Sequence, residues 1–350
     1  MTSPRVTVFT PVHNRPRLVA EAIESTLAQT FGDFEHLVID DGSTDDTALA
    51  VSAFRDPRVR LVRNDANLGI PRTRNRGIDL ARGEYVALLD SDDRSLPGRL
   101  ARQVAFLDAN PAVAAVGSWA REIGPDGTPR RRVFDCAESR IGLAFTLLFR
   151  CAPRQSTMMI RRDVLRAARY DERCAVSQDL ELFGRLARDR EIRALPEPLV
   201  LFRSHPERVT EQPHPERDAI RRRIFAERLR EHGLAPDPQD VDRHMQLTGR
   251  HGRQGATIDA DFVAWAGRWL ADLAHRASGG NEIHPEVLAV ASKLWLGVLK
   301  QASRARVPRI EWGAAAELSR PVQRQLWWLR VRQIGFRSEI GARRARGRRA

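Results

Sequence analysis

Three carboxylates stand within four positions at the end of an apolar run. The run covers residues 85–89, and Asp90, Asp92 and Asp93 follow it. A run that is apolar without alternation is typical of a strand buried on both faces of a parallel sheet, and open α/β sheets bind ligands at the carboxyl ends of such strands. Carboxylates this close repel one another, and their oxygens suit Mg²⁺ or Mn²⁺, which can hold a diphosphate. The segment therefore predicts a metal and diphosphate site; a polar turn after a strand is the alternative.

The elements that would position these carboxylates follow from alternating strand and helix patterns over the first 110 residues. Strands are expected at 6–10, 34–39, 59–63 and 84–89, and helices at 18–29, 44–54 and 70–81. Repeated βα units of this length predict an α/β fold with a doubly wound, mostly parallel sheet. Further strands are expected at 113–119, 156–160 and 199–203, with a helix at 180–187.

The chain changes character after a predicted loop at residues 204–218. Periodic helical segments follow, at 218–232, 239–247, 259–277, 285–303 and 311–334. Residues 216–350 carry 26 basic and 15 acidic side chains, against 32 and 30 in residues 1–215, so most of the net charge of +13 lies in the C-terminal part. We expect an α/β domain at 1–215, a helical region at 216–337 and a basic, disordered tail at 338–350.

Polar motifs follow the predicted strands in a set order. They are Thr10-Pro11-Val12-His13-Asn14, Asp40-Asp41-Gly42-Ser43-Thr44-Asp45, Asn67-Leu68-Gly69 with Arg74-Asn75, Asp90-Ser91-Asp92-Asp93, Ser177-Gln178-Asp179 and Phe202-Arg203-Ser204-His205. Each motif alone is weak evidence, but the six in this order over residues 4–210 closely resemble the family 2 glycosyltransferases. The resemblance implies the GT-A fold. It also implies transfer of a sugar from a nucleotide-diphosphate sugar, with UDP as the expected nucleotide.

The resemblance implies a nucleotide pocket at the ends of the first two strands. Pro11, His13 and Asn14 would form its wall, with His13 stacked on the base; a solvated turn residue is the alternative for His13. Asp41 resembles the carboxylate that accepts a hydrogen bond from uracil, and a helix cap is the alternative for it. Arg74 resembles the basic residue near the base and the phosphates.

The resemblance also implies a divalent metal, Mn²⁺ or Mg²⁺, at the carboxylate cluster. Asp90 would approach the ribose and the metal, Asp92 would bind the metal, and Ser91 between them would belong to the nucleotide-sugar site. The metal would bridge the diphosphate and neutralise charge on the leaving nucleotide. His205 is expected to complete the metal or diphosphate site because neutral imidazole suits Mn²⁺; an ordinary loop histidine is the alternative.

Asp179 matches the aspartate of the family's Glu-Asp motif, although Gln178 stands where glutamate is common. Its expected role is the general base that takes a proton from an acceptor hydroxyl as that oxygen attacks the anomeric carbon. A single displacement of this kind inverts the anomeric configuration. A helix N-cap is the alternative role for Asp179, and Glu181 is the second candidate for the base.

Two other enzyme classes fit the sequence poorly. A sugar-nucleotide-synthesising transferase would place a Gly-rich phosphate loop after the first strand, where this chain has residues 11–14, and no G-x-G-x-x-G dinucleotide motif follows that strand. A non-catalytic protein of the same fold that binds sugar nucleotides or an anionic surface remains the alternative function. No nucleic-acid-binding module is recognised, so no specific nucleic acid is expected as a partner.

Composition and the positions of the apolar and cysteine residues predict the cellular compartment of the protein. No apolar run approaches the ~18–20 residues of a membrane span, the first strand leaves no room for a signal peptide, and Cys136, Cys151 and Cys174 lack metal or redox spacing. We therefore expect a cytoplasmic protein with reduced thiols. The basic tail favours peripheral contact with an anionic inner membrane face. Trp327 and Trp328 fit either a membrane interface or the core of a helical packing surface, and the core is the favoured interpretation. The expected partners are the nucleotide-sugar donor and a glycan or lipid-linked acceptor in cell-surface or exopolysaccharide synthesis.

Overall fold

The chain divides into two compact units in a computed structural model. One unit comprises residues 1–147 and 151–224, and the other comprises residues 148–150 and 225–350. The structure describes residues 3–206, 208, 212–248, 258–280, 282–305, 307 and 315–322. The domain boundary predicted after residue 215 stays a prediction. The predicted tail at 338–350, Trp327, Trp328 and the end of the last predicted helix lie outside the described residues.

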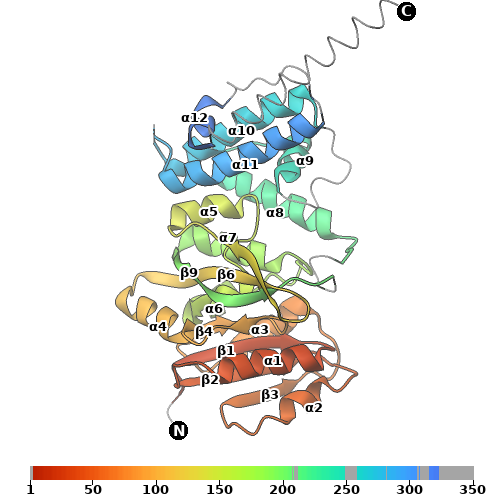
Figure 1. The fold of residues 1–350 in the computed structure, drawn as a ribbon. Coiled ribbons are helices and arrows are strands. Elements are labelled where there is room, and N and C mark those ends of the chain that lie inside the picture. Colours follow the sequence, from red (N-terminus) through yellow and green to blue (C-terminus); the bar gives the residue numbers. More distant parts are fainter. Residues whose placement is uncertain are drawn as a thin grey trace, which may run out of the picture. The chain divides into compact units, whose positions relative to one another are not determined.

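A mixed sheet of nine strands forms the centre of the first unit (Figure 1). Four parallel strands make one half, in the order β3 (Val59–Arg63), β2 (Phe34–Asp40), β1 (Val6–Val12) and β4 (Tyr85–Leu88). The other half continues with β8 (Met159–Arg161), β6 (Val113–Ile123), β9 (Glu191–Arg203) and β5 (Arg94–Ser95), while β7 (Pro129–Phe134) pairs with β6. The β6–β9 pair is parallel, and the pairs β4–β8, β6–β8, β5–β9 and β6–β7 are antiparallel.

The predicted α/β class is confirmed, and its parallel half explains where the polar motifs meet. All seven residues of β2 and all four of β4 are buried, as a strand covered on both faces requires. In the sheet register Val12 lies opposite Asp40, and Phe9 lies opposite Leu88. The carboxyl ends of β1, β2 and β4 therefore lie side by side, and the turns that follow them form one edge of the sheet.

Helices cover the sheet, and the helices after β1, β2 and β3 begin where the polar turns end. The helices that cover the sheet are α1 (Pro16–Leu27), α2 (Thr47–Ser52), α3 (Ile70–Leu80), α4 (Arg99–Ala109), α5 (Arg140–Leu147), α6 (Arg162–Ala168) and α7 (Gln178–Asp189), with the 3₁₀ turn η1 (Gln155–Thr157). Helix α3 lies very close to β1, because a Cβ atom added at Gly77 would lie 2.3 Å from ring atoms of Phe9. This close approach requires glycine at position 77 and holds α3 against the sheet edge.

The predicted helical C-terminal region is also confirmed. It contains α8 (Arg217–Glu231), α9 (Pro238–Leu247), α10 (Ala260–Ser278), α11 (Pro285–Arg304), α12 (Ala316–Ser319) and the 3₁₀ turn η3 (Arg320–Val322). Asp237 and Asp259 cap α9 and α10 by accepting backbone hydrogen bonds of 2.8 and 2.7 Å. Trp295 of α11 is fully buried in this unit. Among the described helices, none is both long and apolar enough to cross a membrane.

Candidate active site

The turns after β1 and β2 are joined to each other by hydrogen bonds. His13 Nδ1 lies 3.0 Å from the Asp41 carbonyl oxygen, which accepts its hydrogen bond. The Asn14 backbone N–H donates to Ser43 Oγ at 2.9 Å, and Asn14 Oδ1 accepts from the Thr44 N–H at 2.9 Å. Asn14 adopts a left-handed φ of 51°, which asparagine tolerates better than most residues. The structure therefore brings together the residues predicted for the base pocket at this edge, namely Pro11, His13, Asn14 and Asp41.

The Asp41 carboxylate holds the following loop in place. Its Oδ1 accepts from Asn64 Nδ2 at 2.6 Å and from the Leu68 N–H at 2.9 Å, and its Oδ2 accepts from the Gly69 N–H at 3.1 Å. The residue is only 5% exposed. A carboxylate offers about four acceptor positions, so three internal donors leave it able to accept one more hydrogen bond. Asp41 is thus positioned rigidly, and its part in ligand binding stays a prediction.

Arg74 of α3 is a buried cation with donors to spare. Its side chain is 7% exposed, Nη2 donates to Asp90 Oδ1 at 2.8 Å, and the guanidinium lies 5.3 Å from the centre of the Tyr170 ring. Its Nε and Nη1 are buried without a hydrogen-bond partner. Since leaving such donors unpaired is costly, this is a site at which an anionic group would be stabilised.

Asp90 lies beside Arg74, and its surroundings act on the pKa of its carboxyl in opposite directions. Burial raises the pKa of its carboxyl, the Arg74 charge opposes that rise, and repulsion from Asp92 and Asp179 adds to it. The Asp90 side chain keeps 30% of its surface accessible, so a ligand can reach it. The Asp90 N–H donates to Ser156 Oγ at 3.0 Å, which fixes the turn, and the neighbouring Ser91 is 4% exposed.

Asp92 has two basic partners. Its Oδ2 accepts from Arg15 Nη1 at 2.7 Å and lies 3.0 Å from His205 Nε2, and both contacts are largely buried. Burial alone would raise the pKa of Asp92, but the His205 hydrogen bond and the charges of Arg15 and His205 lower it below its usual value. The structure therefore joins the first turn, the carboxylate cluster and the predicted histidine, whereas Arg15 was not predicted as part of the site.

Asp93 is an internal support for the cluster. Its carboxylate is buried, accepts the Ser156 hydroxyl hydrogen, and accepts the Arg203 N–H at 2.8 Å. Burial, together with repulsion from Asp92 and Asp90, holds the pKa of Asp93 well above its usual value. Arg203 Nε donates to the Asp92 carbonyl at 2.8 Å, so Arg203 also fixes the main chain of the cluster. Sequence reasoning noted the Arg203-Ser204-His205 motif but assigned a role to the histidine alone.

The donor set at this edge fits a divalent cation that takes its other ligands from a substrate. The described residues contain no group of three or more His, Cys, Asp or Glu side chains gathered as a complete metal site. Mg²⁺ is commonly held by one or two carboxylates together with substrate phosphates and water. Asp90 and Asp92 offer such a pair, with the His205 ring beside Asp92.

Asp179 stands in the first turn of α7. Ser177 before the helix has a left-handed φ of 59°, and Asp179 Oδ1 accepts the Leu180 N–H at 2.8 Å. The N-terminus of a helix carries partial positive charge, which attracts a carboxylate. Arg74 acts electrostatically on Asp179 as well as on Asp90. The structure therefore brings the predicted base into the electrostatic environment of the carboxylate cluster.

Cys151 is a neighbour of Asp179 that sequence reasoning missed. Burial raises the pKa of its thiol well above the usual value, and the charge of Asp179 and a hydrogen bond with the Asp179 side chain add to that rise. The Cys151 thiol donates its hydrogen to the Pro153 carbonyl oxygen, which lies 3.7 Å from Sγ. The spacing of the cysteines in the sequence does not predict the contact with Asp179.

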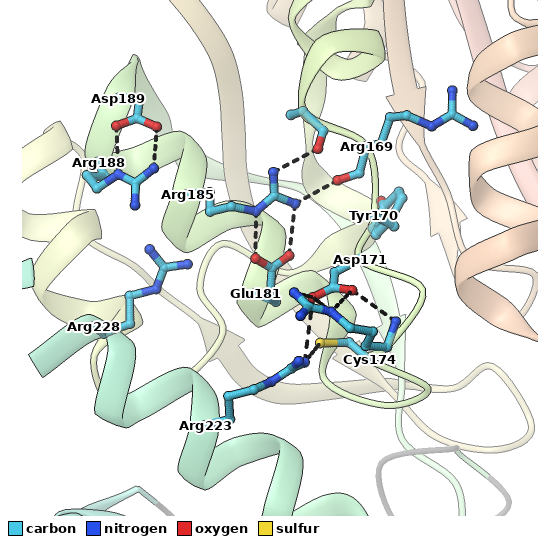
Figure 2. Close-up of polar contacts among 12 residues, drawn as sticks. Arg169, Tyr170, Asp171, Cys174, Glu181, Arg185, Arg188, Asp189, Arg223 and Arg228 are labelled. Atoms are coloured by element: carbon cyan, nitrogen blue, oxygen red, sulfur yellow. Dashed lines mark hydrogen bonds and ion pairs between the residues drawn. The ribbon is translucent and has the colours of Figure 1, made fainter. Parts of the chain in front are cut away.

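Glu181, the second candidate for the base, has a structural partner (Figure 2). Arg185 Nε and Nη2 donate to its two carboxylate oxygens at 2.5 and 2.9 Å, and Arg185 also donates to the carbonyls of Ala168 and Arg169 at 2.7 Å. The Glu181 residue is 8% exposed. A carboxylate held on both oxygens by a structural arginine is a poor proton acceptor for a ligand, so the geometry favours Asp179.

A pocket of about 420 Å³ opens beside the start of α3. Its lining is mostly apolar and comprises Leu68, Gly69, Ile70, Pro71, Arg72, Glu172, Ala175, Val176 and His214. None of these is a predicted site residue. The candidate site is therefore defined by its hydrogen bonds and charges, and this pocket adjoins it through Leu68 and Gly69, which donate to Asp41.

Comparison with known proteins relates this chain to sugar transferases. The family described as Glycosyl transferase family 2 matches residues 7–167. The glycosyltransferase MJ1057 of Methanocaldococcus jannaschii is 28% identical over 214 residues, which cover 58% of this chain and 72% of the relative. The succinoglycan biosynthesis protein ExoO of Rhizobium meliloti is 45% identical over 113 residues, but these cover only 32% of either protein.

Solved structures show the same fold. The crystal structure of S. aureus TarS 1–349 in complex with UDP-GlcNAc matches with a TM-score of 0.55 and 18% sequence identity. The match covers 95% of this chain and 88% of that one. At this level of identity the likeness concerns the fold alone, and it confirms the GT-A-type fold that the sequence motifs implied.

Proposed function

We propose that the protein moves a sugar from a UDP-sugar to an acceptor hydroxyl with inversion, as the match of residues 7–167 to the glycosyl transferase family 2 supports. The observation that carries this proposal is Arg74, a buried guanidinium with two unpartnered nitrogens beside Asp90. Its free donors suit the diphosphate of a nucleotide sugar. The TarS complex with UDP-GlcNAc and the succinoglycan role in the name of ExoO support a UDP-sugar and a surface polysaccharide.

On the donor side, the proposed site lies at the ends of β1, β2 and β4. Pro11, His13 and Asn14 form one wall, and the remaining acceptor position of Asp41 binds the uracil N–H. Asp90 and Ser91 contact the nucleotide sugar. These roles agree with the adjacency of the β1 and β2 turns, which are hydrogen-bonded to each other.

Asp90 and Asp92 are the proposed ligands of a Mn²⁺ or Mg²⁺ ion, with His205 at its margin. When bound, such an ion supplies positive charge that stabilises the leaving diphosphate. The chain's own contribution is to hold both carboxylates in place. Arg74 pairs with Asp90, and Arg15 and His205 pair with Asp92.

On the acceptor side, Asp179 is the proposed general base. It takes the proton of an acceptor hydroxyl while that oxygen forms a bond to the anomeric carbon. The bond from the anomeric carbon to the diphosphate oxygen breaks on the opposite side, so the configuration inverts. Negative charge then develops on the diphosphate, and Arg74 donates to it from a position that needs no rearrangement.

UDP binding tests the donor half of this proposal. Asp41→Ala should weaken the calorimetric UDP affinity by about 1–3 kcal/mol, the range for a lost hydrogen bond to a charged or buried group. The matched control is Asp46→Ala, since Asp46 is an exposed carboxylate five residues away whose side chain makes no cap hydrogen bond to α2. UDP affinity that is equal in the wild type and in Asp41→Ala would remove Asp41 from the site. Failure of the wild type to bind UDP, GDP or dTDP would refute the function.

A further inference from the structure

Three arginines surround two aromatic rings in the first unit. The rings of Phe134 and Phe202 meet edge to face, with centroids 5.2 Å apart and an interplanar angle of 77°. Arg132 lies 4.5 Å from the Phe134 centroid, Arg154 lies 4.4 Å from Phe134 and 4.6 Å from Phe202, and Arg208 lies 4.4 Å from Phe202. These five residues form the arginine–aromatic cluster. They come from β7, from the segment before η1, from β9 and from the loop after β9.

The two aromatic rings form a platform on which the three guanidinium groups pack. Phe202 is 6% exposed and packs with Ala120 and Val200, so the platform is part of the core, whereas Arg132 is exposed. Because Arg132 is exposed, its guanidinium can donate two parallel hydrogen bonds to an oxyanion.

The cluster also has uncompensated charge. Arg130, on the same face of β7 as Arg132, is paired with Glu122 at 3.4 Å. Arg132 forms no ion pair within the described part of the chain. The cluster therefore gathers three positive charges on two apolar rings and presents at least one of them to solvent. Such a surface is stabilised by an anion.

The arginine–aromatic cluster lies beside the carboxylates of the proposed active site. The Arg208 backbone N–H donates to the His205 carbonyl at 3.4 Å, and the Arg208 charge acts on Asp92. The Arg154 carbonyl accepts the Thr157 N–H at 2.9 Å in the turn that carries Ser156, whose hydroxyl oxygen accepts the Asp90 N–H at 3.0 Å. A group bound to the cluster would thus lie next to the site of the proposed sugar transfer.

We propose that the acceptor is anionic, and that the arginine–aromatic cluster binds a phosphate or carboxylate group that the acceptor carries near the hydroxyl to be glycosylated. This inference rests on the proposed function. The donor diphosphate is not the expected occupant, because Arg74 already offers that group two buried donors on α3. The arginines instead select acceptors by charge, and a neutral glycan would lack the oxyanion that their N–H edges recognise.

Binding of defined probes tests the inference. The probes are hexagalacturonate, which carries carboxylates, geranyl diphosphate, which carries a lipid-linked diphosphate, and neutral maltohexaose, each titrated with and without saturating UDP. The wild type should bind at least one anionic probe at least tenfold more tightly than maltohexaose. Arg132→Ala should lose about tenfold of that affinity, or about 1.4 kcal/mol, and Arg132→Ala/Arg154→Ala should lose more. The probe whose affinity falls in Arg132→Ala shows whether the cluster binds a carboxylate or a diphosphate.

The matched control is Arg131→Ala. Arg131 is exposed and adjacent in sequence, but its side chain points to the opposite side of β7. If Arg131→Ala and Arg132→Ala lose the same affinity for the anionic probe, the effect depends only on overall charge and the inference is overturned. Equal affinity of the wild type for neutral and anionic probes would also overturn it. Arg132→Lys keeps the charge without the planar fork, so it should bind with intermediate affinity even if the double variant misfolds.

UDP affinity separates this inference from the proposed function. It should be unchanged in Arg132→Ala, because that residue lies outside the donor site. A fall in UDP affinity together with unchanged probe binding would assign the cluster to the donor and overturn the inference while the proposed function stands. A wild type that binds the anionic probes but no nucleotide would refute the proposed function instead.

Discussion

Replacement of Arg74 by methionine tests the donor site most sharply among single substitutions. Methionine keeps the length and apolar stem of the side chain but removes the guanidinium. The two nitrogens without a protein partner, Nε and Nη1, are the ones proposed to donate to the diphosphate. Hydrogen bonds to charged groups contribute about 1.5–3 kcal/mol each. A total loss of about 3 kcal/mol corresponds to UDP affinity weaker on the order of a hundredfold.

The same substitution has a predictable cost in stability. Asp90 would lose its partner at 2.8 Å, and removing one member of a buried pair costs about 3–5 kcal/mol. Since the Asp90 side chain is 30% accessible, we expect about 2 kcal/mol here. Arg74→Met/Asp90→Asn removes both charges and should recover much of that stability. Arg74→Lys should keep most of the stability and only part of the UDP affinity, because it lacks the fork of donors.

Isothermal titration of UDP, with urea unfolding of the same preparations, measures both effects. The decisive comparison is between Arg74→Met and Arg74→Lys at concentrations where both are folded. If Arg74→Met binds UDP as tightly as the wild type while its unfolding free energy falls, Arg74 is only the structural partner of Asp90. The reasoning from its unpartnered nitrogens would then be refuted.

Metal removal, pH and the tail provide three further tests. EDTA should abolish turnover, and Asp92→Asn should lose the metal dependence of calorimetric UDP binding; full activity in a metal-free preparation would contradict both. Burial lowers the pKa of His36 to about 3, so its contribution to stability is complete above the unfolded value of 6.5 and is lost as the pH falls toward 3. The unfolding free energy should therefore drop by about 2 kcal/mol between pH 6.5 and 5, and an equal drop in His36→Asn would show that another group is responsible. Deleting residues 338–350 should weaken binding to anionic vesicles without changing turnover of a soluble acceptor, and equal wild-type binding to neutral and anionic vesicles would count against membrane contact.

The parallel half of the sheet was predictable because its strands carry strong local patterns. Residues 85–88 are apolar without alternation, residues 34–39 are apolar except for Glu35 and His36, and the structure buries all of them. The other half was harder to predict. Strand β9 has 13 residues, but Pro196 and Pro198 interrupt its strand pattern, and only its last five residues were expected. Strand β5 has two residues, too few for any periodicity to appear. The strand expected at 156–160 overlaps β8 only at residues 159 and 160, because residues 155–157 form the 3₁₀ turn η1.

The residues of the candidate site also divide into those that a local pattern predicts and those that it does not. Residues that follow a strand, such as Asp41 and Asp90, were predicted because motif and strand end coincide in the sequence. Arg15, Ser156 and Cys151 were missed, since each acts on a residue far along the chain. Arg15, for example, reaches Asp92 across 77 positions, and that contact depends on the packing of α1 beside β5 and not on any local pattern.

The account as a whole depends on sugar transfer with Asp179 as the base. The direct measurement is nucleotide release from UDP-, GDP- and dTDP-sugars with Mn²⁺ and candidate acceptors, in the wild type and in Asp179→Asn, with the donor dissociation constant measured for both. Asp179→Asn keeps the shape of the side chain and removes its basicity. It should lower kcat by about 10²–10⁴-fold and leave donor affinity nearly unchanged, with an inverted anomeric product. Transfer by Asp179→Asn at the wild-type rate would contradict the account, and so would loss of donor binding in that variant.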